Sequence, residues 1–345
     1  MELEEAIAQH VADWNTAVVE RDVLGTQVPA QIAGAFQRFC RQHLHAEAGD
    51  CLFYRSSVGC VAGLTLDDGR AVVVKAHQPG QREARLAACQ RVQRSLHARG
   101  FPAPEPLVAP VPFGLGFAVA ERYLHEGEVR DAHDRAVRRL LANGLHAIAA
   151  SASPPERFRD LGGAWFTALG DRLWPRPHNA HFNFEQSAQG AEWIDALARR
   201  ARAVPLAGEL VVGHFDWRAE HVLVSQGRIT TAYDWDSLHL EREPVVVGAV
   251  AHAFTARWDG VQPTVEPTPS LEEMRGFVAD YESARGRDFD AAERKLLWSS
   301  CVYSTAYTAR CEHSLASDGD WHPSYRTFGQ LLREVGEELL GAPSM

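Results

Sequence analysis

The sequence predicts a two-lobed α+β fold, in which a small antiparallel β-sheet lobe precedes a larger, mostly helical lobe. Residues 51–124 contain short runs of β-forming residues separated by turn signals, whereas apolar residues in 125–345 recur mainly at every third or fourth position. The chain has 345 residues, of which 46% are hydrophobic, so it is long enough to bury a core in each lobe. We expect a cleft between the two lobes.

Composition narrows the classes of partner. The formal net charge is −10, and basic residues form no block longer than two. Nucleic acids and anionic membranes are therefore not expected partners, whereas a small cationic molecule would be favoured. The chain begins with acidic residues, not with a secretory signal, and its longest apolar run, 244–254, is too short to cross a bilayer. We expect a cytoplasmic protein, and the sequence leaves its oligomeric state open.

The six cysteines contain no CxxC pair and have no histidines at the spacing of a zinc site. This pattern predicts buried, reduced thiols and neither a disulfide framework nor a zinc site.

The first fifty residues predict a helical N-terminal extension. Ile7, Val11 and Trp14 recur at helical spacing, and a similar pattern follows from 32 to 39. The sequence does not indicate what this extension does.

The β-rich lobe over 51–124 begins with three runs, CLFYRS, CVAGLTL and RAVVVK, and the turn signal Asp-Asp-Gly separates the last two. The next segment has helical spacing and ends at Gly100. Two further runs, around PLVAPVP and FAVAERYL, enclose a glycine turn at 114–116. These signals predict a small antiparallel sheet with one helix inserted.

Residues 125–345 predict a helical lobe. Its helical patterns cover 131–150, 191–204, 271–285 and 324–340, and two of its helices begin with the capping boxes Ser270/Glu273 and Asp290/Glu293. The exception is 210–236, where LVVGHF, HVLV and RITTAY read as short strands.

Two aspartates follow these embedded strands. Asp216 comes after the first strand, and Asp234 ends the last one. Because the sequence suggests that a tight turn joins their strands, we expect both carboxylates at the same end of a hairpin. Two close carboxylates repel each other unless a cation lies near them, so the arrangement implies either Mg²⁺ or a raised pKa on one aspartate.

The segment from His214 to His221, HFDWRAEH, resembles the HxDxxxxN catalytic loop of the aminoglycoside phosphotransferase and choline kinase-like family, which is related to the protein kinases. Asp234-Trp235-Asp236, eighteen residues after Asp216, resembles that family's metal-binding segment. Upstream, the run AVVVK resembles the strand whose lysine, here Lys75, reaches the nucleotide phosphates. The resemblance covers roughly residues 50–340, with the motifs in the family's order.

The resemblance implies a protein kinase-like fold, with ATP and Mg²⁺ as cofactors. Asp216 would orient or deprotonate an acceptor hydroxyl, Asp234 would hold magnesium, and Lys75 would contact the phosphates of the nucleotide. As alternatives from the sequence, the aspartates could merely cap turns and the lysine could be a solvated strand residue. Glu83, the only acid between Lys75 and Glu105, is expected to pair with Lys75 in the nucleotide site. Further nucleotide contacts are expected from Ser57 and Gly59 in a phosphate-covering loop, and from the hinge at Glu121 and Tyr123.

His221 departs from the family pattern, which has asparagine at this position. An amide oxygen is a hard ligand suited to magnesium, whereas imidazole suits zinc, copper or nickel better. Three interpretations follow: His221 hydrogen-bonds the Asp216 loop or a metal-bound water, it coordinates a metal weakly, or the enzyme has lost activity and kept the fold.

The acceptor is expected to be a small, amine-bearing molecule with a hydroxyl group, such as an aminoglycoside, an amino sugar or an amino alcohol. Acids interleaved with aromatic residues in the helical lobe can hold an amine by charge and by cation–π attraction. Asp236 and Glu312 are the chosen substrate contacts; Glu241, Asp318 and Asp320 are further candidates. The competing hypothesis is a catalytically impaired nucleotide-binding or scaffold protein of the same fold.

Overall fold

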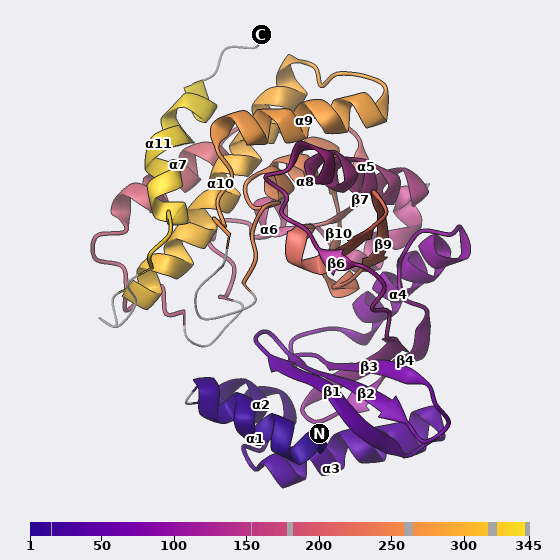
Figure 1. Cartoon of the computed structure of the whole chain (residues 1–345). Helices are drawn as coiled ribbons and strands as arrows, with labels where there is room; N and C mark the ends of the chain where they lie inside the picture. The colour runs from indigo at the N-terminus through magenta and orange to yellow at the C-terminus, as the bar shows by residue number, and fades with distance from the viewer. Residues whose placement is uncertain (15, 153, 178–181, 259–264, 317–322, 342–345) are drawn as a thin grey trace. The chain divides into compact units, whose positions relative to one another are not determined.

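The computed structural model describes residues 1–14, 16–152, 154–177, 182–258, 265–316 and 323–341. The chain divides into two compact units, one from Met1 to Leu124 and one that begins at His125 (Figure 1). The first unit contains an antiparallel sheet and the second is mostly helical, so the fold class is the one predicted from the sequence.

The sheet of the first unit has five strands in the order β1-β2-β3-β5-β4, and every neighbouring pair is antiparallel. The Asp-Asp-Gly signal forms the turn between the second and third strands, as predicted. The third strand lies at the centre of the sheet. The strands are β1 (Ala48–Ser56), β2 (Cys60–Leu66), β3 (Ala71–Ala76), β4 (Pro106–Phe113) and β5 (Gly116–Arg122).

One helix, α4 (Glu83–Ala98), connects β3 to β4. Gln93 in this helix donates a hydrogen bond to Glu121 Oε2 at 2.5 Å. Glu121 is the cross-strand partner of Val73, and side chains alternate between the faces of a strand. The contact therefore assigns α4 to the sheet face that carries Val73 and Lys75.

The predicted N-terminal extension forms three helices that cover the opposite face of the sheet (Figure 1). Apolar residues of these helices share one buried core with sheet residues such as Leu64, Val72 and Val74. Burying this sheet face removes apolar surface from water, which is the main stabilising contribution to such a unit. The helices are α1 (Leu3–Trp14), α2 (Val18–Leu24) and α3 (Pro29–Phe39), followed by a π-helical turn, η1 (Cys40–Leu44).

The second unit is built around α10 (Ala291–Ala316), which packs against α7, α8 and α11. Gly248 in α8 allows a close approach, because a Cβ atom there would lie 2.0 Å from the carbonyl oxygen of Leu297 in α10. The other helices are α5 (Arg135–Ser151), α6 (Trp165–Ala168), α7 (Glu192–Arg202), α8 (Glu243–Ala251), α9 (Leu271–Arg285) and α11 (Phe328–Gly341), with a 3₁₀ helix, η2 (Pro155–Leu161).

Two small sheets lie within the second unit. β7 (Leu210–His214) pairs with β10 (Leu238–Arg242), and β8 (Val222–Ser225) lies between β6 (Glu128–Val129) and β9 (Arg228–Ala232). The sequence-based expectation that a tight turn joins the strands before Asp216 and Asp234 is therefore wrong. Asp216 follows a strand of one sheet and Asp234 follows a strand of the other.

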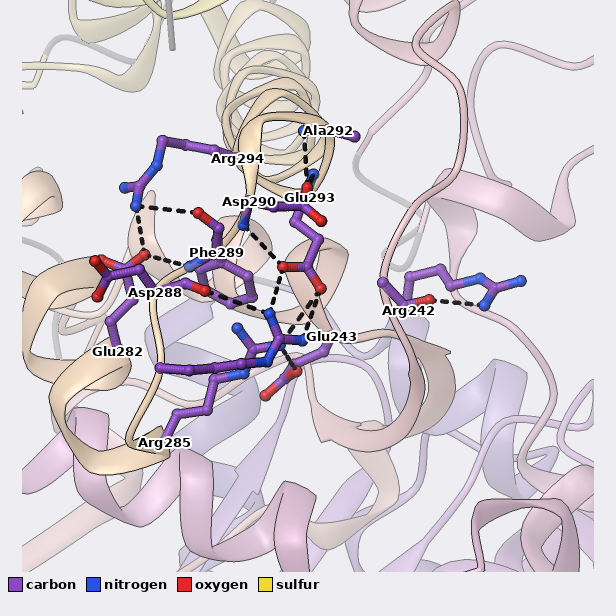
Figure 2. Close-up of polar contacts among 12 residues, drawn as sticks. Arg242, Glu243, Glu282, Arg285, Asp288, Phe289, Asp290, Ala292, Glu293 and Arg294 are labelled. Atoms are coloured by element: carbon purple, nitrogen blue, oxygen red, sulfur yellow. Dashed lines mark hydrogen bonds and ion pairs between the residues drawn. The ribbon is translucent and has the colours of Figure 1, made fainter. Parts of the chain in front are cut away.

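Ion pairs join α8, α9 and α10 at one end of the helical unit (Figure 2). Arg285 Nη2 lies 2.6 Å from Glu243 Oε2, and Arg287 Nη1 lies 2.8 Å from Glu293 Oε2. Glu293 also completes the predicted capping box with Asp290, and the second predicted box, Ser270/Glu273, is present as well. The hydrogen bond from Arg287 lowers the pKa of Glu293 to about 2.

All six cysteines are buried thiols outside any disulfide, as the sequence predicted. Among the described residues, none of the helices combines the length and the apolar character that crossing a membrane requires.

Candidate active site

Three side chains of the second unit form a cluster that could hold a metal ion. Asp216, His221 and Asp234 each offer one ligand atom, and these atoms lie within 4.8 Å of one another. All three residues are half-buried. Two carboxylates and one imidazole are a suitable donor set for a divalent cation, so the residues present fit the metal that the resemblance implies.

His214 connects the loops that carry the two aspartates. It is fully buried, its Nε2 lies 3.1 Å from the carbonyl oxygen of Tyr233, and its Nδ1 accepts a hydrogen bond from the backbone amide of Asp216 at 3.3 Å. An amide N–H can only donate and a carbonyl can only accept, so these contacts select the neutral ring with its proton on Nε2. Burial lowers the pKa of His214 and favours the same neutral form.

Asp234 adopts a left-handed backbone conformation, with φ 65° and ψ 43°. A side chain in this region costs about 1 kcal/mol, although aspartate tolerates it better than most residues. Ser237 compensates locally, because its Oγ donates to Asp234 Oδ2 at 2.8 Å and its backbone amide donates to the Asp234 carbonyl at 3.1 Å. The tight turn places the carboxylate next to the Asp216 loop.

Arg218 is a site residue that the sequence reasoning did not assign. Its Nη1 hydrogen-bonds Asp216 Oδ1, and its Nε donates to Glu220 Oε1 at 2.6 Å. Glu220 Oε2 accepts a hydrogen bond from the backbone amide of Trp258. Burial raises the pKa of Glu220, whereas Arg218 and His221 lower it, and the net shift is downward. The position of Arg218 within the loop motif, two residues after Asp216, was the available signal.

The ring of His221 is fixed by the loop that precedes it. Its Nδ1 lies 2.8 Å from the backbone carbonyl oxygen of Asp216, and its Nε2 lies 3.5 Å from Glu220 Oε1. Since a carbonyl only accepts, Nδ1 carries a proton and, in the neutral ring, Nε2 keeps the lone pair. Metal-binding histidines commonly donate their other ring N–H to a backbone carbonyl in this way. The structure thus contains the hydrogen bond between His221 and the Asp216 loop that the first of the three interpretations proposed. Coordination of a metal by His221 stays a prediction.

The predicted nucleotide residues belong to the first unit. Lys75 is half-buried in the central strand β3, on the sheet face that also carries Glu121. The backbone amide of Tyr123 donates to the carbonyl of Ala71 at 2.9 Å, which continues the pairing of β5 with β3. Glu83 is exposed at the start of α4. The convergence of Lys75 with the metal cluster and its pairing with Glu83 stay predictions.

The predicted phosphate-covering loop is the turn between β1 and β2. Ser56 pairs with Cys60, and the amide of Ser57 donates to the carbonyl of Gly59 at 3.2 Å. A Cβ atom at Gly59 would lie 2.3 Å from the carbonyl oxygen of Ala76, so only glycine fits there. The turn is therefore tight, and Gly59 lies close against the backbone at the end of β3.

The predicted substrate acids lie in different surroundings. Asp236 is half-buried in the 3₁₀ turn η4 (Trp235–Ser237), directly after Asp234. Glu312 is only 6% exposed, and its two oxygens accept hydrogen bonds from the backbone amides of Phe328 and Gly329, each at 3.0 Å. Glu312 thus caps the start of α11, and burial raises its pKa to about 7. To hold an amine it would have to share oxygens already used for this cap.

Of the other substrate candidates, Glu241 lies among the described residues and offers no exposed carboxylate. Glu241 is buried, and its Oε1 accepts a hydrogen bond from the backbone amide of Arg242 at 2.8 Å. Asp318 and Asp320 lie outside the described residues. The described aromatic residues near these acids in the sequence, Trp298, Tyr303 and Tyr307, are buried; the ring of Tyr303, for example, stacks on Trp174 with 5.4 Å between the ring centroids.

Comparisons with known proteins find a matching sequence family and solved structures of similar fold. The sequence model of the phosphotransferase enzyme family matches residues 64–242, which include the two aspartates and the lysine. No curated protein sequence matches the chain. An amicoumacin kinase crystallised with AMP-PNP and Ca²⁺ is similar in structure, with a TM-score of 0.57 at 12% identity over 91% of this chain and 96% of that one.

Two further solved structures are similar in fold. A spectinomycin phosphotransferase in complex with ADP and spectinomycin has a TM-score of 0.52 at 12% identity, over 89% of this chain and 93% of that one. An ethanolamine kinase of Plasmodium vivax has a TM-score of 0.52 at 13% identity, over 98% of this chain and 93% of that one. At such identities the likeness shows a shared fold, and activity has to be argued from the site.

Proposed function

Because the chain belongs to the phosphotransferase enzyme family, we propose that it transfers the γ-phosphate of ATP to a hydroxyl group of a small molecule. The observation that carries this proposal is the cluster of Asp216, His221 and Asp234, whose ligand atoms lie within 4.8 Å of one another. Solved structures of similar fold contain AMP-PNP with Ca²⁺ or ADP, which supports the use of a nucleotide and a divalent cation.

Asp234 and His221 would hold the divalent cation, for which we propose Mg²⁺. When bound, such a cation neutralises charge on the phosphate oxygens and so lowers the barrier to transfer. Asp234 supplies a hard oxygen ligand from a turn that Ser237 stabilises. His221 would supply a ring nitrogen, and the contact of its Nδ1 with the Asp216 carbonyl orients the imidazole in the cluster.

Asp216 would orient the acceptor hydroxyl and accept its proton. Arg218 holds one carboxylate oxygen of Asp216, which fixes the carboxylate and compensates its charge, so the other oxygen can face the acceptor. Arg218 is itself held by Glu220 at 2.6 Å. The loop therefore fixes the reacting carboxylate through a chain of charged side chains.

The nucleotide would bind to the first unit. We propose that Lys75 contacts its phosphates, with Glu83 as the paired acid, and that the Ser57–Gly59 turn offers backbone amides to the same phosphates. Backbone groups at Glu121 and Tyr123 would hydrogen-bond the adenine. The side chain of Glu121 is already engaged by Gln93, which agrees with a role for its backbone only.

The acceptor would carry an amine, as the net acidity and the acids near the site suggest. Asp236 is the favoured contact, because it follows Asp234 directly and is half-buried. Spectinomycin and ethanolamine appear in the names of two enzymes of similar fold, which supports an acceptor of this kind. Glu312 is the second candidate. Its carboxylate would have to bind the amine while its two oxygens still accept the hydrogen bonds that cap α11.

The test measures ATP binding and Mg²⁺-dependent ADP release, with and without a panel of amino sugars, aminoglycosides and amino alcohols. We expect one acceptor class to stimulate ADP release, and Asp216→Asn to lower turnover by about 100-fold or more while ATP still binds. Asp288→Asn, at an exposed acid remote from the cluster, is the matched control.

His221 in place of asparagine favours a second candidate, a nucleotide-binding protein of the same fold that does no transfer. In that case ATP would bind, no acceptor would stimulate turnover, and Asp216→Asn would change nothing. A wild-type protein that binds no nucleotide would contradict both candidates.

A further inference from the structure

The N-terminal helices reach the base of the predicted phosphate-covering turn. His10 in α1 lies with its Nε2 at 2.9 Å from Ser56 Oγ and at 3.1 Å from the backbone nitrogen of Ser56. Ser56 is the last residue of β1, and its pairing with Cys60 closes the Ser57–Gly59 turn. One side chain, 46 residues away in the sequence, therefore holds the strand end from which the turn emerges.

The hydrogen bond defines the state of the ring. A backbone N–H can only donate, so Nε2 of His10 must carry a lone pair and the imidazole must present an acceptor to Ser56. His10 is 7% exposed, and its ring packs edge-on against Tyr54 with 5.4 Å between the ring centroids. The ring is therefore held in place by packing, and its acceptor is directed at the strand end.

Other contacts prevent the helices from moving away from the sheet. The hydroxyl of Tyr54 donates to Glu20 Oε1 at 3.1 Å, and both residues are buried. The carbonyl of Val23, at the end of α2, accepts a hydrogen bond from the amide of Leu115 in the β4–β5 turn at 2.8 Å. The extension thus anchors two hairpin tips of the sheet and shares a hydrophobic core with it.

We propose that His10 is a positioning residue for the nucleotide, which it serves by fixing the Ser57–Gly59 turn; this rests on the proposed function. The turn has only three residues between β1 and β2, so it has few backbone amides for the phosphates, and their directions depend on how the end of β1 is held. A turn that is fixed before binding needs no ordering when the nucleotide arrives, and this preorganisation increases affinity. The helical extension is then a part of the nucleotide site.

Three variants of the full chain test the proposal. His10→Ala removes the acceptor. His10→Gln keeps one, because a glutamine oxygen reaches about as far from the backbone as Nε2 does. Tyr54→Phe removes the hydrogen bond to Glu20 and so weakens the same interface, but it leaves His10 and Ser56 in contact.

For each variant the Kd for ATP is measured by titration, together with KM for ATP, kcat and Tm. Loss of the His10 contacts with Ser56, the residue before the turn, predicts that His10→Ala raises Kd and KM for ATP about fivefold, with kcat changed less than about twofold. We expect His10→Gln to restore most of the affinity. Tyr54→Phe should lower Tm and leave Kd and KM for ATP as in the wild type.

Two results would overturn the proposal. In the first, His10→Ala lowers Tm but binds ATP as the wild type does. In the second, Tyr54→Phe weakens ATP binding as much as His10→Ala, so the helices would only stabilise the sheet. A wild-type chain that binds no ATP would overturn the proposed function and this inference together, whereas an unchanged Kd in His10→Ala would overturn this inference alone.

Discussion

The Nδ1 atom of His221 lies 2.8 Å from the backbone carbonyl oxygen of Asp216, so the loop that carries Asp216 also orients the imidazole in the cluster of Asp216, His221 and Asp234. An imidazole nitrogen favours borderline metals over Mg²⁺ more than an amide oxygen does. The metal preference of this enzyme should therefore depend on one side chain.

We predict that His221→Asn shifts the metal preference toward Mg²⁺. The wild type should bind Mn²⁺ much more tightly than Mg²⁺, and the variant should narrow this ratio and raise Mg²⁺-dependent turnover. Mn²⁺ binding is measured by electron paramagnetic resonance, and Mg²⁺ is then added as a competitor. His313→Asn, at a histidine that contacts the carbonyl of Gln189 instead, is the control. If the ratio of Mn²⁺ affinity to Mg²⁺ affinity is the same in wild type and variant, His221 does not bind the metal.

A second prediction concerns Arg218. Replacing it with methionine keeps most of the side-chain volume but leaves Asp216 and Glu220 without their shared cation. We expect kcat to fall by about 100-fold with a smaller change in KM for ATP, because a misplaced reacting group costs roughly that much. Steady-state kinetics at saturating ATP measure the effect. Unchanged kinetics would show that Asp216 needs no support from Arg218.

The ion-pair cluster of Figure 2 predicts acid sensitivity. Glu293 has a pKa lowered from 4.5 to about 2, so its stabilising contribution is present above pH 4.5 and is lost as the pH falls toward 2. In Arg287→Ala this contribution should shrink, and the free energy of unfolding at pH 7 should fall by roughly 1–3 kcal/mol. Urea unfolding at pH 7 and at pH 3 should then show a smaller pH difference in the variant than in the wild type.

Glu312 predicts the opposite pH dependence. Its folded-state pKa is raised from 4.5 to about 7, so the stability linked to its protonated form is present below pH 4.5 and is lost as the pH rises through 7. Glu312→Gln cannot ionise, and its stability relative to the wild type should increase between pH 5 and pH 8. Thermal unfolding across this range measures the difference. A constant difference would mean that Glu312 does not titrate there.

A fifth prediction tests the packing of α8 on α10. Gly248→Ala would place a Cβ atom 2.0 Å from the carbonyl oxygen of Leu297, and the helices must move apart to relieve this contact. We expect a loss of about 2 kcal/mol or more in the free energy of unfolding. In Gly341→Ala a Cβ atom would meet nothing within 4 Å, so this control should be neutral or slightly stabilising.

The elements that the sequence predicted well are those whose signals are local. The turn after β2, the inserted helix α4 and both capping boxes follow from residues a few positions apart. The pairing of β7 with β10 was missed, because nothing in the local pattern of either strand identifies a partner 24 to 32 residues away. The error in pairing did not separate Asp216 from Asp234, because His214 joins their loops through contacts that depend on the folded structure.

In the site, too, the sequence identified residues that belong to local motifs but missed contacts that depend on the folded structure. Asp216, His221 and Asp234 come together in the second unit, as their motifs suggested. The role of Arg218, by contrast, depends on where its guanidinium points, and this is set by Glu220 and by the path of the loop. Glu312 was predicted from its position at the end of an apolar helix, yet the start of α11 uses both of its oxygens. The purpose of the N-terminal helices could not be predicted, because helical spacing marks an apolar face without identifying what covers it.

The buried imidazole of His214 has a consequence for how this enzyme fails. One neutral ring receives a hydrogen bond from one loop and donates to the segment before the other, so local opening of either loop breaks the link to both. The two aspartates should therefore lose order in a single cooperative event. A substitution that removes the imidazole of His214 should therefore displace both carboxylates together and not one of them alone.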